Sequence, residues 1–332
     1  MSLKIIRDED VAVALLNMGG PATQEEIEPF LRRLFNDRLI IRFPFAQFLF
    51  AEVLIRARLE KVKERYQFIG GGSPILASCL AQANALNAEL KKRGRALEVF
   101  LSFNYSDPLP ATTMAAIKNK RKKYILPLSL YPHYSLSTTA SNIFYLKKEA
   151  QRTYPEAIFL ESYSYHLDDG YIQAFVDRIH AVTNPPEKLD DFYLLFSAHG
   201  TPFYFLKEGD PYSYLVSQSI GRILGSLQRQ HHWSMSYQSA VGPMAWLKPS
   251  TGSMIKALAA GGVKKIIVVP ISFVNDHIET LCEIDIEYRQ LAKECGINDF
   301  RTVKAIECHP GFISALADCV ENSLAFCHPR MP

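Results

Sequence analysis

Three glutamates recur at intervals of four residues in the C-terminal half of the chain: Glu279, Glu283 and Glu287. They follow a β-branched run, residues 266–269, that Pro270 ends, which predicts a long helix beginning beyond a buried parallel strand. The spacing places the three carboxylates in a row on one helix face, where like charges repel by roughly 0.2–0.5 kcal/mol per pair. Such a row is either a solvated acidic face or a set of hard oxygen ligands and proton acceptors.

A histidine at the head of this row favours a functional site over a solvated face. Asp276 and His277 precede Glu279, at the edge of a parallel sheet where ligands bind. An imidazole titrates near neutral pH and serves as a base or a metal ligand. A second histidine, His199, ends another predicted strand in the string SAHGTP, where it is either a structural loop residue or a further group of the site. The helix over residues 276–294 therefore predicts proton-transfer or metal chemistry at this edge.

The composition limits the classes of protein that remain. With 332 residues, 48% of them hydrophobic, the chain can build one large or two smaller compact domains. A net charge of +3 without a basic stripe argues against nucleic acid as a partner. Acidic residues interrupt the N-terminus and the six cysteines form no CxxC pair, so we expect a cytoplasmic protein with free thiols.

Apolar runs that alternate with helical patterns predict a parallel α/β fold. The predicted buried strands are residues 11–16, 98–103, 123–130, 192–196 and 266–269. Two pairs of strings echo one another along the chain: KKYILPLSL with KKIIVVPISF, and LLNMGGP with LLFSAHGTP. We therefore predict two Rossmann-like, doubly wound parallel-sheet domains, residues 9–150 and 151–330, with a cleft between them.

Residues 39–55 (LIIRFPFAQFLFAEVLI) form an unusually apolar connection. Arg42, Gln47 and Glu52 interrupt it, so it does not span a bilayer, and basic residues flank it on both sides. The segment is either an ordinary core helix or an exposed apolar lip that marks an interface or a ligand mouth. In the second case its aromatic side chains would be the contact groups: Phe43, Phe45 and Phe48.

Several strings in the chain closely resemble those of the ferrochelatases, the enzymes that insert ferrous iron into a porphyrin. They are LNMGGP, IGGGSPI, SAHGTP, GDPY, YQSAVGPMAWLKP and FVNDHIETLCEIDIEY. The resemblance extends over residues 15–317 and implies a porphyrin cleft between the two domains. It also implies a lyase that inserts Fe2+ into protoporphyrin IX to give protohaem, the last step of haem biosynthesis.

The resemblance also assigns roles to individual residues. The implied catalytic set consists of His199, Glu279, His277, Asp276, Glu283 and Glu287. His199 is then the base or first metal ligand and Glu279 the opposing carboxylate and metal ligand, while Glu283 and Glu287 pass metal or protons. The implied porphyrin contacts are Met18, Ser73, Tyr105, Trp246 and Phe273. Met18 is typical of the protoporphyrin subgroup, whereas Asn104 departs from the family's usual Arg and leaves the propionate-binding residues open.

Cofactor and partners follow from the same resemblance. Relatives with a two-iron cluster carry a Cys where Leu136 stands and three clustered cysteines near the C-terminus, so we predict no iron–sulfur cluster and Fe2+ as substrate metal only. The family's apolar lip touches the membrane surface, which predicts peripheral contact with the inner face of the cell membrane. Protoporphyrin IX is the expected partner, together with a transient contact to the preceding enzyme of the haem pathway.

Three alternative functions stay open. A coproporphyrin ferrochelatase or another tetrapyrrole chelatase would share the fold, because a fold does not determine its substrate. A non-catalytic carrier of tetrapyrrole or metal would bind both and turn over neither. A hydrolase with Ser73 or Ser197 as nucleophile is disfavoured, because the chain contains no G-x-S-x-G elbow.

Overall fold

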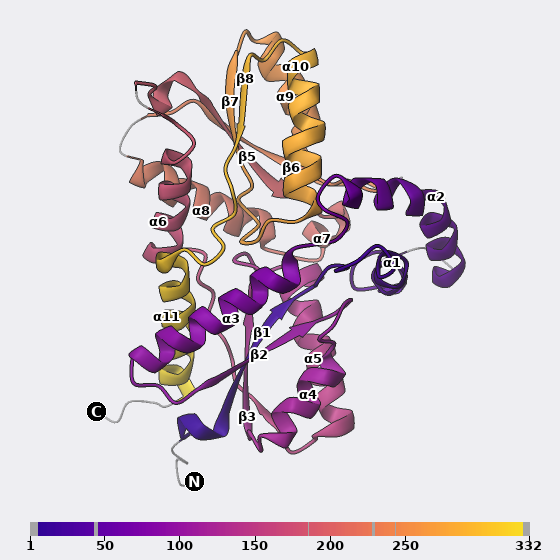
Figure 1. The fold of residues 1–332 in the computed structure, drawn as a ribbon, viewed down its shortest axis with the longest axis vertical. Helices are drawn as coiled ribbons and strands as arrows, with labels where there is room; N and C mark the ends of the chain where they lie inside the picture. The colour runs from indigo at the N-terminus through magenta and orange to yellow at the C-terminus, as the bar shows by residue number, and fades with distance from the viewer. Residues whose placement is uncertain (1–5, 43–45, 185, 228–229, 243, 328–332) are drawn as a thin grey trace.

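Two parallel four-stranded sheets organise this computed structural model, which describes residues 6–42, 46–184, 186–227, 230–242 and 244–327. The sheets have the orders β2-β1-β3-β4 and β6-β5-β7-β8 and lie one above the other along the long axis (Figure 1). The strands of the first are β1 (Val11–Asn17), β2 (Glu98–Phe103), β3 (Tyr124–Ser129) and β4 (Ile158–Phe159). The strands of the second are β5 (Tyr193–His199), β6 (Trp233–Gln238), β7 (Lys265–Val269) and β8 (Asp299–Thr302).

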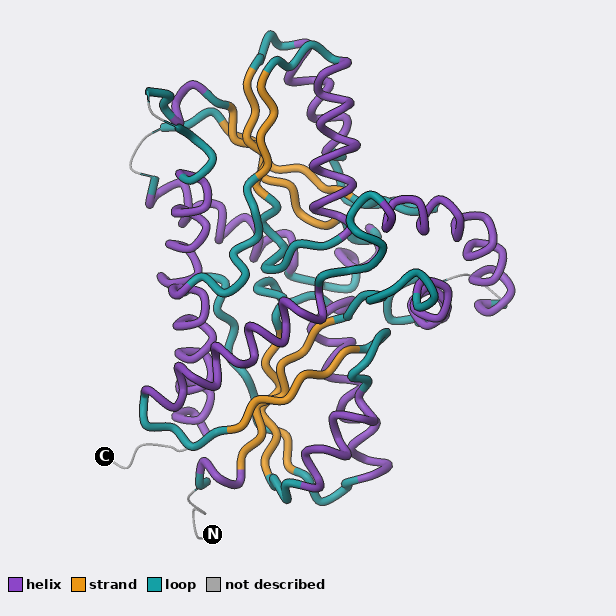
Figure 2. The backbone as a smooth tube through the Cα atoms, viewed as in Figure 1, coloured by secondary structure: helices purple, strands orange, loops and turns teal. Residues whose placement is uncertain are grey.

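Helices connect the strands and surround both sheets (Figure 2). Those of the first half are α1 (Ile27–Asn36), α2 (Gln47–Gln67), α3 (Ile75–Lys92), α4 (Pro110–Asn119) and α5 (Ser141–Thr153). Those that follow are α6 (Asp169–His180), α7 (Phe203–Lys207), α8 (Tyr212–Ser226), α9 (Thr251–Ala260), α10 (Arg289–Glu294) and α11 (Pro310–Cys327). Short 3-10 turns are η1 (Asp8–Asp10) and η3 (Leu189–Asp191), and π-helical segments are η2 (Leu136–Ala140) and η4 (Glu279–Tyr288). No helix of the described chain combines the length and apolar character that a bilayer crossing requires.

The strand β1 shows why the predicted strands read as continuous apolar runs. All seven of its residues are buried, and successive side chains point to opposite faces of the sheet. Val13 and Leu15 pack into the main core with α3, whereas Ala14 and Leu16 pack into a separate core with α4 and α5. Because both faces are covered, no alternation with polar residues is required, as is typical of parallel sheets.

The predicted fold class is confirmed, and the two halves share one strand order. The echoed strings lie in corresponding strands, since β3 occupies in the first sheet the place that β7 occupies in the second. The division into residues 9–150 and 151–330 stays a prediction. The last helix, α11, packs against both α6 and α3, so the end of the chain returns to the first half.

The acidic helix differs from its prediction in type. A helix does cover most of the predicted range 276–294, but its first ten residues, η4, are π-helical and only α10 is α-helical. A π-helix closes i→i+5 hydrogen bonds and is rare outside functional sites. The hydrophobic pattern of the sequence does not distinguish it from an α-helix, because residues four apart stay near one face in both.

The apolar segment around α2 is both packed and exposed. Helices α1 and α2 project from the side of the molecule (Figure 1), and Ala51 and Ile55 pack against α1 in a small core. Other apolar residues of the first turns of α2 are exposed to solvent: Phe48, Leu49 and Val53 are 59%, 64% and 67% exposed. The predicted contact residues Phe43 and Phe45 lie outside the described residues. Some apolar residues of the segment thus pack as in a core helix, and others are exposed as in an apolar lip.

Candidate active site

A cavity of about 450 Å³ lies between the two sheets. Its walls come from the segments that follow β1, β3, β5, β6 and β7, together with one face each of α1, α2 and η4. Ligands of doubly wound sheets bind beyond the carboxyl ends of the strands, and here two such edges share one space. The volume lies in the range that small-molecule sites occupy.

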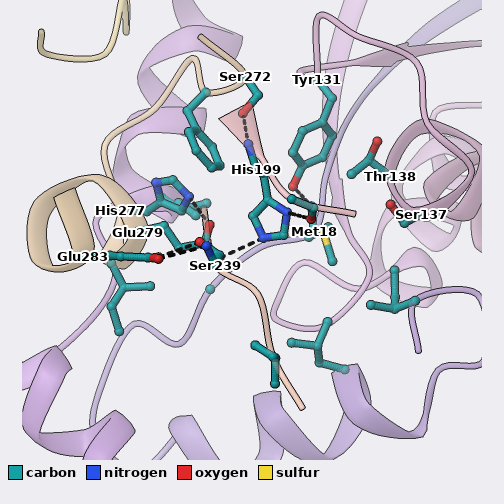
Figure 3. A pocket seen from close by; sticks show the side chains of 18 of the residues that line it. Met18, Tyr131, Ser137, Thr138, His199, Ser239, Ser272, His277, Glu279 and Glu283 are labelled. Carbon is teal, nitrogen blue, oxygen red and sulfur yellow. Dashed lines mark hydrogen bonds and ion pairs between the residues drawn. The ribbon is translucent and has the colours of Figure 1, made fainter. Parts of the chain in front are cut away.

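His199 is the last residue of β5 and faces into this cavity (Figure 3). Its backbone N–H donates to Ser272 Oγ over 2.8 Å, which ties the end of β5 to the segment after β7. Its Nδ1 lies 2.5 Å from the carbonyl oxygen of Gly200. Because a carbonyl only accepts, Nδ1 carries a proton, so Nε2 is the atom that can accept one in the neutral imidazole.

Glu279 lies between two imidazoles at the first residue of η4. Its Oε1 is 3.2 Å from Nε2 of His199, and its Oε2 is 2.8 Å from Nε2 of His277. Gln238, at the end of β6, donates from Nε2 to the backbone carbonyl of Glu279 over 3.1 Å. The predicted pairing of His199 with Glu279 is thus present in the geometry. His277 is a third member of this cluster, so two imidazoles share one carboxylate.

Within this cluster, the carboxylate and the imidazoles shift one another's pKa values in opposite directions. Burial lowers the pKa of His199, but the charge and hydrogen bond of Glu279, with the charge of Glu283, outweigh burial and raise it. Burial raises the pKa of Glu279, yet the charges and hydrogen bonds of His199 and His277 hold it well below its usual range. The pair therefore favours an imidazolium beside a carboxylate, which is the product of proton transfer to Nε2.

Glu283 and Glu287, the other two glutamates at the four-residue spacing, each have a partner of their own. The repulsion among the three carboxylates is therefore offset. Glu283 accepts from the backbone N–H and Oγ of Ser239, over 2.9 and 2.5 Å, and from the Tyr288 hydroxyl over 2.9 Å. Glu287 forms an ion pair with Arg65 of α2 over 2.8 Å. All three carboxylate residues line the cavity, as the four-residue spacing predicts.

Four of the five predicted porphyrin contacts line the cavity: Met18, Ser73, Trp246 and Phe273. The indole N–H of Trp246 donates to the Val241 carbonyl over 2.9 Å, so its polar atom is satisfied within the protein. The ring of Phe273 packs on that of His277 with centroids 4.4 Å apart. The walls are therefore largely apolar or aromatic, as a planar macrocycle requires.

Two predicted site residues do not line the cavity. Tyr105 is buried behind the wall, where its hydroxyl donates to Asp37 over 2.5 Å and its backbone N–H donates to the carbonyl of Met18. Asp276 turns away from the cavity, and its Oδ1 accepts from the hydroxyl of Thr280 over 2.9 Å at the start of the acidic helix. Both residues support neighbouring site residues instead of reaching the cavity.

Helix α2 contributes a face to the cavity that the sequence did not predict. Arg58, Val62, Arg65 and Tyr66 all line the cavity, and their spacing is that of one helix face. The sequence contains that periodicity, but it does not show which part of the protein this helix face contacts. Arg58 makes no hydrogen bond or ion pair with any residue that the structure describes.

The glycine turn after β1 lets two other segments of the chain pack closely against it. Gly19 has a φ of +83°, and a Cβ there would lie 2.2 Å from Ser106 Oγ. A Cβ on Gly20 would lie 2.7 Å from Ser73 Oγ. No side chain therefore fits at either position, and both glycines also line the cavity, where their backbone can lie close to a ligand.

Two solved structures of chelatases share this fold. The structure titled SirB from Bacillus subtilis with Fe3+ matches with a TM-score of 0.55 and 15% identity, over 95% of this chain and 96% of that chain. The sirohydrochlorin chelatase SirB from Bacillus subtilis subspecies spizizenii, in complex with cobalt, matches with a TM-score of 0.54 and 14% identity, over 95% of each chain. At these identities the likeness concerns the fold alone, and it defines a two-domain, chelatase-like α/β protein.

Sequence comparison gives the particular family. The ferrochelatase family model matches residues 10–324. The ferrochelatase of Trichodesmium erythraeum is 40% identical over 319 residues, which are 95% of this chain and 82% of that protein. The ferrochelatase of Synechococcus elongatus is 41% identical over 320 residues with the same coverage. The chain belongs to the ferrochelatase family, the enzymes of haem synthesis that insert ferrous iron into a porphyrin, and the predicted resemblance is confirmed.

Proposed function

We propose that this ferrochelatase acts as a lyase that inserts Fe2+ into protoporphyrin IX to form protohaem. The observation that carries the proposal is the row of His199, Glu279 and His277 inside an apolar cavity between the two sheets. Insertion releases two pyrrole N–H protons as the metal enters, so the site needs a base and a path for charge. His199 supplies the proton acceptor, and Glu279 with Glu283 and Glu287 supplies carboxylates that attract a divalent cation.

His199 is the base in this mechanism. Its Nδ1–H is held by the Gly200 carbonyl, so neutral Nε2 accepts the two pyrrole protons one after the other. Each imidazolium formed lies 3.2 Å from Glu279 and releases its proton along the carboxylates to solvent before the next transfer. Glu279 stabilises that charge without a change of geometry, as a preorganised electrostatic group does. Fe2+ reaches the same groups as a substrate along Glu287 and Glu283, where it replaces the hydrogen bonds that now hold these carboxylates.

The walls of the cavity select and hold the macrocycle. Met18, Trp246 and Phe273 offer apolar surface on which a porphyrin lies and against which it is distorted, so that its nitrogen lone pairs face the metal. Met18 favours protoporphyrin IX, as its subgroup does. Arg58 is a cation at the cavity without a partner among the described residues, and a guanidinium suits a carboxylate, so we assign a propionate to it.

Anaerobic incubation with Fe2+ and either protoporphyrin IX or coproporphyrin tests this function. Loss of free-base fluorescence with protoporphyrin, faster than with coproporphyrin at equal concentration, is the expected result. Faster reaction of coproporphyrin would assign the chain to the other ferrochelatase subgroup. Tight binding of porphyrin and metal without loss of fluorescence would instead indicate a carrier.

We further propose that the exposed face of α2 touches the inner face of the cell membrane from the cytoplasm, where the substrate and the preceding haem-pathway enzyme are met. Phe48, Leu49 and Val53 are exposed apolar residues on the same helix whose Arg58 and Val62 line the cavity. Burying each in the acyl boundary contributes at most about 1.5–3 kcal/mol before ordering costs are subtracted.

Replacing Phe48, Leu49 and Val53 together with serine is expected to reduce co-sedimentation with anionic liposomes severalfold. Turnover with detergent-solubilised protoporphyrin should stay close to that of the wild type, because none of the three side chains lines the cavity. A matched control replaces three comparably exposed apolar residues elsewhere: Leu80, Phe144 and Ile158. Equal liposome binding by the two triple variants would refute the membrane contact.

The protein is predicted to hold no iron–sulfur cluster. Leu136 stands where cluster-bearing relatives have a cysteine, and it begins the π-helical segment η2. The purified, haem-free protein should therefore be colourless and should contain no acid-labile sulfide. Chemical analysis that finds two irons and two sulfides per chain would contradict this prediction.

A further inference from the structure

Glu307 lies between β8 and α11 and has a left-handed backbone, with a φ of +46°. A residue with a Cβ adopts this conformation only where its surroundings hold it, and such residues cluster at functional sites. The backbone N–H of Glu307 donates to the Val274 carbonyl over 2.9 Å, and its carbonyl accepts from Nε2 of Gln82 over 3.1 Å. Gln82 belongs to α3, so Glu307 joins the second half of the protein to the first.

The carboxylate of Glu307 holds the two residues that precede His277. Its Oε1 accepts from the backbone N–H of Asp276 over 2.8 Å, and its Oε2 accepts from Nδ2 of Asn275 over 3.3 Å. Asn275 is buried and lines the cavity, and its Oδ1 lies 4.0 Å from Sγ of Cys79, a second residue of α3. Hydrogen bonds to a carboxylate are stronger than those between neutral groups, so the turn between β7 and η4 is firmly held.

This turn leads directly into the catalytic groups. His277 follows Asp276, and its Nε2 lies 2.8 Å from Oε2 of Glu279. The His277 ring also packs on the ring of Phe273, with centroids 4.4 Å apart. The position of this imidazole therefore depends on the backbone direction that is imposed at Asp276. Glu307 does not line the cavity, so any influence on the reaction passes through the residues that it holds.

We propose that Glu307 is a positioning residue for iron insertion: it fixes His277 and, through His277, the carboxylate of Glu279. This inference rests on the proposed function of that carboxylate. A displacement of about 1 Å in a catalytic group can cost about 10²-fold in rate. The apolar walls that bind the porphyrin are formed by other segments, which carry Met18 and Trp246. Loss of the two carboxylate hydrogen bonds should therefore lower kcat and leave the KM for porphyrin nearly unchanged.

Three substitutions at Glu307 separate this role from a merely structural one. Glu307→Ala removes both side-chain hydrogen bonds and should lower kcat by about 10- to 100-fold. Glu307→Gly removes the same bonds but suits a left-handed backbone, so it should unfold at a higher temperature than Glu307→Ala and yet have the same low kcat. Glu307→Gln keeps an oxygen for the Asp276 N–H and should recover most of the lost kcat. The matched control is Arg121→Gly, which replaces an exposed left-handed residue, with a φ of +55°, away from the cavity and should leave kcat unchanged.

Histidine NMR of the protein free of metal and porphyrin gives a readout that needs no turnover. The ring current of Phe273 shifts the His277 signals, which are assigned from their absence in His277→Ala. These signals should move in Glu307→Ala and Glu307→Gly and return toward their wild-type positions in Glu307→Gln. A wild-type kcat in Glu307→Gly, or unmoved His277 signals in both Glu307→Ala and Glu307→Gly, would overturn the proposal. Since the signals are recorded without substrate, they test the positioning whether or not protoporphyrin proves to be the substrate.

Discussion

Replacing His199 with alanine is expected to lower the rate of iron insertion by about 10²–10⁴-fold, the usual contribution of a positioned general base. The variant loses Nε2, the proton acceptor that the Gly200 carbonyl prepares and that Glu279 stabilises after transfer. Porphyrin affinity should be nearly unchanged, since the apolar walls formed by Met18 and Trp246 remain. The loss should therefore fall on kcat and not on the KM for porphyrin.

Stopped-flow fluorescence under anaerobic conditions measures the rate, and a titration of porphyrin without metal measures affinity. His166→Ala is the matched control, because His166 bonds to Ser164 and Gln218 and does not line the cavity. Near-normal turnover of His199→Ala would show that another group takes the pyrrole protons. Loss of turnover in both variants would indicate a general loss of structure.

The inner part of this site could be predicted from the sequence because parallel sheets bring particular chain positions together. His199 ends β5 and Glu279 follows β7, and these two strands are neighbours in the second sheet. Any residues at their carboxyl ends must lie close together, so a separation of 80 residues in the chain becomes 3.2 Å in space. The resemblance of the strings then selected these two residues from the other polar groups at the edge.

The outer part of the site was less predictable, because it depends on how a side element packs. Arg65 meets Glu287 only because one face of α2 lies along the cavity, and periodicity alone does not show where a helix lies. Asp276 was assigned to the site from its place in a matching string, yet its carboxylate bonds to Thr280. Proximity in sequence to a catalytic residue therefore says little about the direction of a side chain at the first turn of a helix.

The π-helical form of η4 illustrates a further limit. Hydrophobic period and charge spacing suit an α-helix equally well, and no residue type marks i→i+5 bonding. What the structure adds is the set of bonds that hold the row: Ser239 and Tyr288 on Glu283, and Gln238 on the backbone of Glu279. Ser239 adopts a φ of +65°, a costly conformation for a residue with a Cβ, and this places its hydroxyl on Glu283.

Glu279→Gln is expected to lower turnover by about 10²–10³-fold, the cost of removing a preorganised charge from a site of developing charge. The glutamine keeps the shape of the side chain but no longer stabilises an imidazolium. In the wild type burial lowers the pKa of His199, but the charge and hydrogen bond of Glu279, together with the charge of Glu283, outweigh burial and raise it. Without it burial prevails, so the pKa of His199 falls and the acid limb of the activity profile moves to lower pH, although the maximum is much reduced.

The same substitution changes how stability depends on pH in the protein free of metal and porphyrin. Because the pKa of His199 is raised in the folded state, its ion pair contributes stability that is complete below the unfolded pKa of histidine. That contribution is lost as pH rises through the folded pKa. Glu279, with its lowered pKa, contributes stability that is present above the unfolded carboxyl pKa and is lost as pH falls through the folded one. Glu279→Gln should remove both contributions. Because burial then lowers the folded pKa of His199, the unfolding free energy of the variant should instead fall as pH drops through the unfolded pKa of histidine.

Histidine NMR titration of the metal-free protein measures the effect directly, with the His199 signal assigned from its absence in His199→Ala. Asp285→Asn provides the control, because Asp285 lies on the same helix but bonds to Thr302 and Arg289 outside the cavity. The midpoint of His199 should move to lower pH in Glu279→Gln and stay in place in Asp285→Asn. An identical His199 midpoint in the wild type, Glu279→Gln and Asp285→Asn would show that Glu279 does not control the protonation of His199. Another residue would then have to stabilise the imidazolium.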